Sequence, residues 1–185
     1  MTPGSARARV EAFWAAVVSA TSYSTDMDAQ HLWVESYQGE VLGEALFGLL
    51  ALREEDLARR HQLDVLTLLE RATKELADPV FEARAFDRGD TAATVEAAAD
   101  MADAVAGMTW EEFLGSFEPV ITQFLARYRQ LVELATDKTE RKIAEAYVAH
   151  EEALAVFVRR ALGQEPGEPL QAILALPHVA AAIGS

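Results

Sequence analysis

The segment HLWVESYQGEVLGEALFGLLAL, residues 31–52, has the residue spacing of an α-helix. Large side chains recur at steps of three and four, which places them on one helical face, whereas a strand would alternate at every second residue. This stripe consists of Trp33, Tyr37, Glu40, Glu44, Phe47 and Ala51. No convincing alternating strand appears elsewhere in the sequence, so we predict an all-α protein.

Three further long helices are predicted from stripes of the same kind. One follows the charged turn at 53–56 and ends before Asp78-Pro79, because the residue before a proline avoids the helical region. Another begins at Thr109, and the last runs from Asp137 to about Leu162. We therefore expect an antiparallel four-helix bundle.

The bundle is predicted to occupy about residues 31–163 of a single domain that spans residues 1–185. A short helix over about 6–20 would precede it, and a proline-bounded helical tail over about 164–185 would follow it. This tail would either cap the bundle of its own chain or contact a second copy.

The connections carry their own signals. Thr109 with Glu112 three residues later has the spacing of a capping box, and Pro119 should kink the helix that follows. A weaker, alanine-rich helix is predicted over 91–106. Residues 82–90 form a polar link that could cross the length of the bundle.

Three glycines lie within the helix over 31–52, at positions 39, 43 and 48. Glycine costs about 1 kcal/mol relative to alanine inside a helix. Their presence predicts the close approach of another backbone, and they mark one face of the helix as a contact surface.

Composition excludes several classes of function. The chain has 185 residues, 30 acidic against 16 basic side chains, a net charge of −14 and no cysteine. Such a surface does not suit nucleic acid or anionic membrane, and without cysteine there is no thiolate site. No signal peptide or membrane-spanning segment is evident, so we expect a cytoplasmic protein.

A few ionisable residues are placed where apolar residues are expected. Glu40 and Glu44 lie on the first stripe, Glu70 follows Leu-rich turns, and His150 with Glu151 lies among apolar residues of the last helix. A buried carboxylate is costly unless it is paired, protonated or bound to metal. If these faces meet, the oxygen-rich site suits iron or manganese, or it serves proton transfer.

Other residues near these positions have secondary roles in this interpretation. Tyr37, Thr73 and Tyr147 are expected to line the site, one turn away from the ionisable groups. The remaining histidines, His31, His61 and His178, are predicted to lie at the surface or at helix ends.

Three segments together resemble the ferritin-like superfamily: ESYQGEVLGEALF at 35–47, LERAT at 69–73 and AHEEAL at 149–154. This superfamily includes di-iron carboxylate proteins such as rubrerythrins, ferritins and demethoxyubiquinone hydroxylases. The resemblance implies that Glu44, or Glu40 one turn earlier, is the ligand on the first helix. Glu70 and His150, with Glu151, would supply the others.

The chain departs from the di-iron pattern at two places. A di-iron site needs Glu-x-x-His on two of its helices, but Thr73 stands three residues after Glu70, and Tyr147 stands three before His150. The ligand set is therefore incomplete, which suggests a reduced metal site or none.

Three functions remain open from the sequence. The first is an iron- or manganese-dependent oxidase or oxygenase acting on a small molecule. The second is a metal-free ferritin-like protein in which the carboxylates and His150 form a hydrogen-bonded network or line a pocket for an organic ligand. The third is an interaction module that forms a homodimer through the glycine face and the tail.

Overall fold

The computed structural model describes residues 29–184, and all regular secondary structure within this range is helical. The all-α prediction is therefore confirmed for these residues, whereas the helix predicted over 6–20 lies outside them. The helices are α2 (Ala29–Arg53), α3 (Leu57–Leu76), α4 (Asp78–Arg84), α5 (Thr91–Ala104), α6 (Trp110–Gly115), α7 (Glu118–Leu134), α8 (Lys138–Ala161), α9 (Gln171–Leu174) and α10 (Pro177–Ile183).

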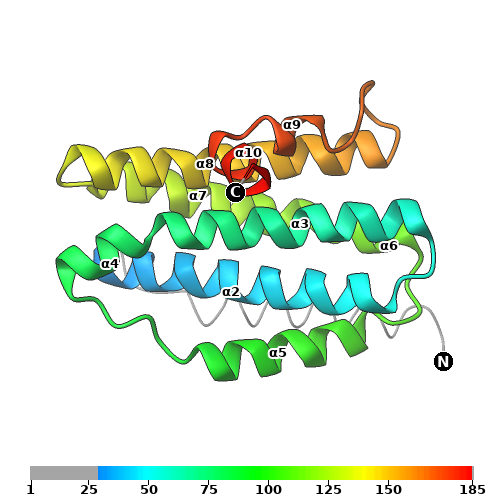
Figure 1. The fold of residues 1–185 in the computed structure, drawn as a ribbon, viewed down its shortest axis with the longest axis horizontal. Coiled ribbons are helices and arrows are strands. Elements are labelled where there is room, and N and C mark those ends of the chain that lie inside the picture. Colours follow the sequence, from blue (N-terminus) through cyan, green and yellow to red (C-terminus); the bar gives the residue numbers. More distant parts are fainter. Residues whose placement is uncertain (1–28, 185) are drawn as a thin grey trace.

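Two helical hairpins form the body of the described structure (Figure 1). Residues 54–56 join α2 to α3, and residues 135–137 join α7 to α8, so the helices of each pair run in opposite directions. The hairpins pack together through α2 against α7 and α3 against α8.

The return along the molecule is made by α5. Thr94 near its start bonds to Gln38 of α2, and Asp103 near its end pairs with Arg53 at the end of α2. The two helices therefore run parallel, as Figure 1 shows. The link predicted over 82–90 is shorter than expected, because α4 extends to Arg84 and α5, with 14 residues, runs beside part of the 25-residue α2.

The apolar side chains form two main clusters along the hairpins. One surrounds Trp33, Phe81 and Tyr128, and the other surrounds Leu66 and Phe157. A layer of buried polar side chains lies where the two clusters meet along α2, α3 and α8: Glu40, Glu70, Thr73, His150 and Glu151. This layer is the main exception to an otherwise apolar core.

The helix predicted from Thr109 is divided in the structure. The capping box of Thr109 and Glu112 is present, with both reciprocal hydrogen bonds. However, α6 ends at Gly115, and α7 begins at Glu118 with Pro119 in its first turn. A proline in the first turn costs no helical hydrogen bond, so one helix ends and a new one begins where we predicted a kink.

The tail caps the bundle of its own chain. Within it, α9 packs on α8 and α10 packs on α3, and Ile173 and Val179 are fully buried. Figure 1 shows both short helices lying over α3 and α8. The C-terminal segment thus contributes to the hydrophobic core of the chain.

The glycines of α2 make room for side chains, whereas we predicted that another backbone approaches them. A methyl group at position 39 would lie 3.1 Å from the ring of Phe124, and one at position 43 would overlap the carboxyl group of Glu70. Position 48 is less crowded, with Thr67 at 3.7 Å. None of the helices between residues 29 and 184 has the length and apolar character of a membrane-spanning segment.

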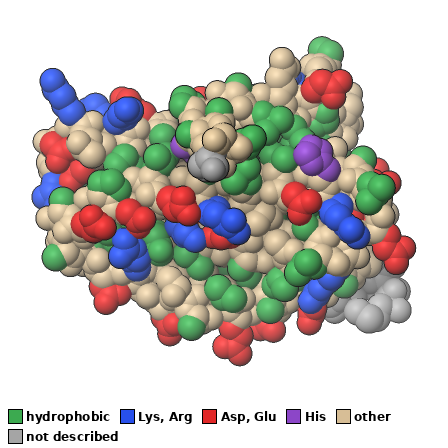
Figure 2. Space-filling view, viewed as in Figure 1, with side chains coloured by type: hydrophobic (Ala, Val, Ile, Leu, Met, Phe, Trp, Pro, Cys, Tyr) green, Lys and Arg blue, Asp and Glu red, His purple; other side chains and the backbone are tan. Residues whose placement is uncertain are grey.

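Side chains of both charges are scattered over the face seen in Figure 2, with apolar side chains between them. No acidic or basic patch covers this face, although the chain as a whole carries a net charge of −14. The surface on this side therefore gives no indication of a polyionic ligand.

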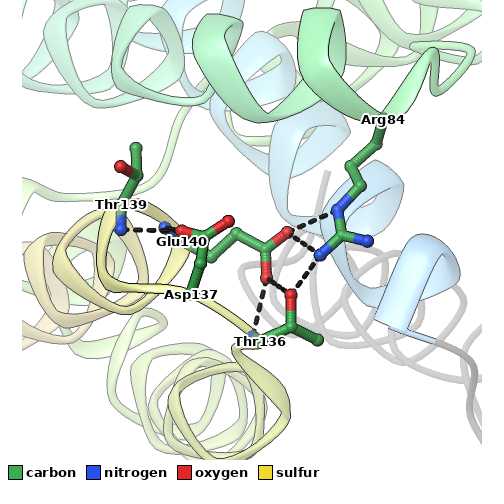
Figure 3. A network of polar contacts seen from close by, with 5 residues as sticks. All are labelled: Arg84, Thr136, Asp137, Thr139 and Glu140. Atoms are coloured by element: carbon green, nitrogen blue, oxygen red, sulfur yellow. Dashed lines mark hydrogen bonds and ion pairs between the residues drawn. The ribbon is translucent and has the colours of Figure 1, made fainter.

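The turn between α7 and α8 is held by a polar network around Glu140 (Figure 3). Asp137 caps α8 by accepting hydrogen bonds from the backbone N–H groups of Thr139 and Glu140. The buried Glu140 carboxylate accepts from the N–H and hydroxyl of Thr136, each at 2.8 Å, and from Arg84 Nε at 2.6 Å. These contacts tie the turn to the end of α4.

We predict that Glu140→Gln destabilises the protein by about 1.5–3 kcal/mol at pH 7, because it weakens hydrogen bonds made to a charged group. Burial alone would raise the pKa of Glu140, but the bonds from Thr136 and Arg84 outweigh burial and lower the pKa below its ordinary value of 4.5. The contribution is therefore complete above pH 4.5 and is lost as the pH falls through the lowered pKa.

Urea unfolding of the wild type and the variant between pH 7 and pH 3 measures this difference. The exposed Glu145 on the same helix provides the control, Glu145→Gln. A difference between Glu140→Gln and the wild type that is independent of pH would contradict the charged role of Glu140.

Candidate metal site in the helical core

Three helices contribute one ionisable side chain each to the polar layer. Glu40 comes from α2, Glu70 from α3 and His150 from α8, and all three are buried. Each residue lies on the apolar stripe of its helix, so packing of that stripe brings its side chain into the core. Tertiary packing therefore concentrates two carboxyl groups and an imidazole at one point.

The ligand atoms of these three residues are close enough to one another to surround a single cation. His150 Nδ1 lies 3.3 Å from Glu40 Oε2, and His150 Nε2 lies 3.6 Å from Glu70 Oε1. One ligand atom from each residue lies within 4.8 Å of the other two. The predicted meeting of carboxylates and imidazole is thus present for Glu40, Glu70 and His150.

Two hydroxyl groups contact this cluster from outside. The hydroxyl of Tyr128 on α7 donates a hydrogen bond of 2.9 Å to Glu40 Oε1. Thr73 Oγ1 lies 3.0 Å from His150 Nδ1. The contacts orient Glu40 and His150, while α7 supplies a phenol in place of a carboxylate.

Part of the cluster is left without hydrogen bonds. Among the described residues, Glu40 Oε2, Glu151 Oε2 and Tyr147 Oη are buried and have no hydrogen-bond partner. Buried acceptors without partners are rare in folded proteins because each costs about 1–3 kcal/mol. Glu40 Oε2 still faces His150 Nδ1 at 3.3 Å as an ion pair, so Glu151 Oε2 is the carboxylate oxygen here that indicates space for a further donor or a cation.

Burial shifts the protonation of these groups. It raises the pKa of Glu70 to about 8, with repulsion from Glu40 adding to it and His150 opposing it. Burial also raises the pKa of Glu151 well above its ordinary range. For His150, burial alone would lower the pKa, but attraction to Glu40 and Glu70 outweighs it, and the pKa is well above its ordinary value.

It follows that protons neutralise much of the site at pH 7. Glu70, whose pKa is about 8, is mostly protonated, and the raised pKa values of His150 and Glu151 favour the protonated form of each. The tyrosine hydroxyls remain neutral, because burial and then the charge of Glu40 raise the pKa of Tyr128 and of Tyr147 well above 10. These protons reduce the negative charge of the site, as a bound cation would.

A small cavity adjoins the cluster. It has a volume of about 40 Å³ and is bordered by Glu40, Glu70, Glu151 and Tyr128, with apolar side chains completing its walls. Space for one water requires about 10–15 Å³ on this measure. The cavity therefore accepts a molecule with very few heavy atoms.

The candidate Glu44 does not join the cluster. Its carboxylate accepts a hydrogen bond of 2.7 Å from Arg71 Nε and also pairs with Lys74, both on the outer side of α3. Burial alone would raise the pKa of Glu44, but these two cations lower it. On the first helix, therefore, Glu40 occupies the place predicted for Glu44.

The predicted lining residues have different positions. Thr73 contacts His150, and Tyr147 is fully buried with its ring centroid 4.9 Å from that of Tyr128. Tyr37 packs on Phe81, at 5.1 Å between ring centroids, and none of Tyr37, Thr73 and Tyr147 borders the small cavity. A lining role for these three residues therefore stays a prediction.

Sequence reasoning missed the contact that His178 makes. His178 lies at a helix end, as predicted, in the first turn of α10, but it is half-buried and its Nε2 lies 3.1 Å from Thr73 Oγ1. No stripe marks it, because α10 is only seven residues long. Its neighbour Val179 in a short apolar segment was the one available signal that this part of the chain is buried.

We predict that Glu70→Gln removes part of the pH dependence of stability. Because the pKa of Glu70 is raised from 4.5 to about 8, the folded state binds this proton more tightly than the unfolded state does. Wild-type stability therefore falls as the pH rises from about 5 to 8, and one group lowers it by at most about 1.4 kcal/mol for each unit of pH.

Urea unfolding of metal-free protein between pH 5 and 8 tests this expectation. Glu70→Gln should give a flatter curve and should be the more stable protein at pH 8. The exposed Glu75 on the same helix supplies the control, Glu75→Gln, whose curve should parallel the wild type. Parallel stability curves for Glu70→Gln and wild type would show that the pKa of Glu70 is not raised in the folded protein.

We also predict opposite effects at two glycines of α2. Gly48→Ala should stabilise the protein by about 1 kcal/mol through helix propensity, because its methyl group makes only ordinary contact. Gly43→Ala should destabilise it by about 1–3 kcal/mol, because the methyl group would lie 2.5 Å from Glu70 Cδ. Urea unfolding at pH 6 measures both, and equal stabilisation by the two variants would contradict the close packing of Glu70.

No protein-family model matches this chain, and neither a curated protein nor a solved structure matches it. The chemistry of Glu40, Glu70 and His150 is therefore what points to a function.

Proposed function

We propose that this chain is a ferritin-like bundle protein that binds iron or manganese through Glu40, Glu70 and His150. The observation that carries the proposal is the convergence of these three groups in the core, with ligand atoms within 4.8 Å of one another. Burying two carboxyl groups and an imidazole together is costly without a cation. Bound metal would replace the protons that now neutralise the site.

The ligand types favour iron or manganese. Carboxylate oxygens suit manganese, and mixed carboxylate and imidazole sets suit iron. Glu151 is not part of this group of three, and its buried Oε2 has no hydrogen-bond partner among the described residues. Tyr128 supports the set by holding Glu40, in the way that hydrogen bonds to metal ligands fix their orientation.

The arrangement of helices agrees with the ferritin-like proposal. Two antiparallel hairpins pack together, and the long connection between them includes α5, which runs parallel to part of α2. Glu70 and His150 match the resemblance at 69–73 and 149–154. Since Thr73 and Tyr147 stand where a di-iron site has further ligands, we propose a single metal ion.

The proposed activity is that of an oxidase or oxygenase whose oxidant is a very small molecule. Iron or manganese held by Glu40, Glu70 and His150 would supply redox chemistry toward dioxygen or a peroxide. The cavity of about 40 Å³ beside these residues admits a molecule of that size. Glu151 borders it, and burial raises the pKa of Glu151, which favours a protonated carboxyl group able to donate its proton to an oxygen atom there.

A metal-free network is the second candidate. It is favoured by the hydrogen bonds that Tyr128 and Thr73 already make to the cluster, which can specify the register of the helices. The buried Oε2 of Glu151, which has no hydrogen-bond partner among the described residues, counts against it, because a completed network would satisfy this atom.

We predict that anaerobic titration with Fe(II) or Mn(II) shows roughly one ion bound per chain, with affinity that rises between pH 6 and 8, because binding displaces protons. Glu40→Gln should weaken binding by about 100-fold or more, since loss of a ligand exceeds the usual effect of losing a supporting group. Calorimetry and elemental analysis measure these quantities.

Glu44→Gln is the matched control, because Glu44 lies one turn from Glu40 on the same helix and is paired at the surface. Its affinity should equal that of the wild type. Oxygen consumption by the Fe(II)-loaded protein then tests the activity. No metal uptake by wild-type protein would refute the metal site and favour the network, and metal uptake without oxygen consumption would refute the oxidase assignment alone.

A further inference from the structure

A chain of hydrogen-bonding groups leads from the candidate metal site to the C-terminal helix. His150 Nδ1 lies 3.0 Å from Thr73 Oγ1, which lies 3.1 Å from His178 Nε2. The three residues come from α8, α3 and α10 and are separated by as many as 105 positions in sequence. Thr73 is fully buried, so both of its contacts lie inside the protein.

The position of His178 is set by the packing of the tail. Val179, the next residue, is fully buried, and Ile173 and Leu176 belong with it to the apolar cluster around Phe157. These anchors hold α10 on α3. The other side of His178 borders a surface groove of about 910 Å³, so the histidine stands between solvent and Thr73.

The protonation of the two histidines determines which group donates and which accepts in each of these hydrogen bonds. His150 Nδ1 lies 3.0 Å from Thr73 Oγ1 and 3.3 Å from Glu40 Oε2, whereas Nε2 lies 3.6 Å from Glu70 Oε1. Nε2 is therefore the nitrogen left to face a cation, and a neutral imidazole bound through Nε2 carries its proton on Nδ1. Thr73 then accepts this hydrogen bond and donates its own hydroxyl proton to His178 Nε2. Burial and then the charge of His150 lower the pKa of His178 to about 4, so His178 is neutral at pH 7 and has a nitrogen that accepts.

We propose that Thr73 and His178 are positioning residues for His150, and that α10 is therefore part of the metal site. His178 holds the hydroxyl of Thr73 as an acceptor toward Nδ1, which fixes the imidazole with Nδ1 beside Glu40 and Nε2 beside Glu70. The proposal rests on the metal site proposed above. It assigns to the C-terminal segment a role beyond covering the core.

Metal titration of four variants tests the proposal. His178→Leu and Thr73→Val should each weaken Mn(II) binding by roughly 10- to 100-fold, as expected for a group behind a metal ligand. The double variant should bind Mn(II) as tightly as Thr73→Val alone, because both substitutions interrupt the same series of hydrogen bonds. His178→Gln, whose amide oxygen can accept from Thr73, should restore most of the affinity.

His61→Leu is the matched control, because it removes an exposed histidine from the start of α3. Its affinity should equal that of the wild type. Equal affinity of His178→Leu and wild type, additive losses in the double variant, or failure of His178→Gln to restore binding would each overturn the proposal.

A measurement without metal separates this proposal from the metal site itself. In ¹⁵N-labelled protein, the Nδ1–H signal of His150 should be lost in Thr73→Val, shifted in His178→Leu and close to wild type in His178→Gln. If wild-type protein binds no metal but these signals respond as expected, the metal function fails and the positioning of His150 stands. Signals that are unchanged in Thr73→Val and His178→Leu overturn the positioning role.

Discussion

The burial of Glu40, Glu70 and His150 in one layer is the constraint to which the surrounding structure is adapted. Two carboxyl groups cannot both be charged at this separation in a low-dielectric core without a strong local compensation. The protein has one such compensation in the imidazolium of His150 and another in the raised pKa of Glu70. Helices α2, α3 and α8 therefore meet where the burial of ionisable groups is unfavourable, but where the side chains hold one another in defined positions.

Several features far apart in sequence serve this layer. Gly43 leaves room for the carboxyl group of Glu70, and Tyr128 reaches from α7 to hold Glu40. The tail places His178 behind Thr73 and thereby behind His150. Support of this kind is what a site needs if its groups are to keep their geometry when a ligand replaces a proton.

Much of the fold follows from local chemistry. Helical periodicity, the Asp137 cap and the capping box at Thr109 are short-range properties, and the structure has them close to the predicted positions. Glu70 and His150 were also predictable, because each is an ionisable residue on a strong apolar stripe. The break before Pro119 was less so, since a proline permits either a kink or a new first turn.

The sequence by itself determined that the chain is helical, acidic and provided with ionisable groups on faces that must be buried, because periodicity and composition are local. Only the tertiary structure decided between Glu40 and Glu44. They lie one turn apart on the same stripe, and the choice depends on whether His150 or the pair Arg71 and Lys74 lies opposite. The same reason explains His178, whose role exists only because α10 packs on α3.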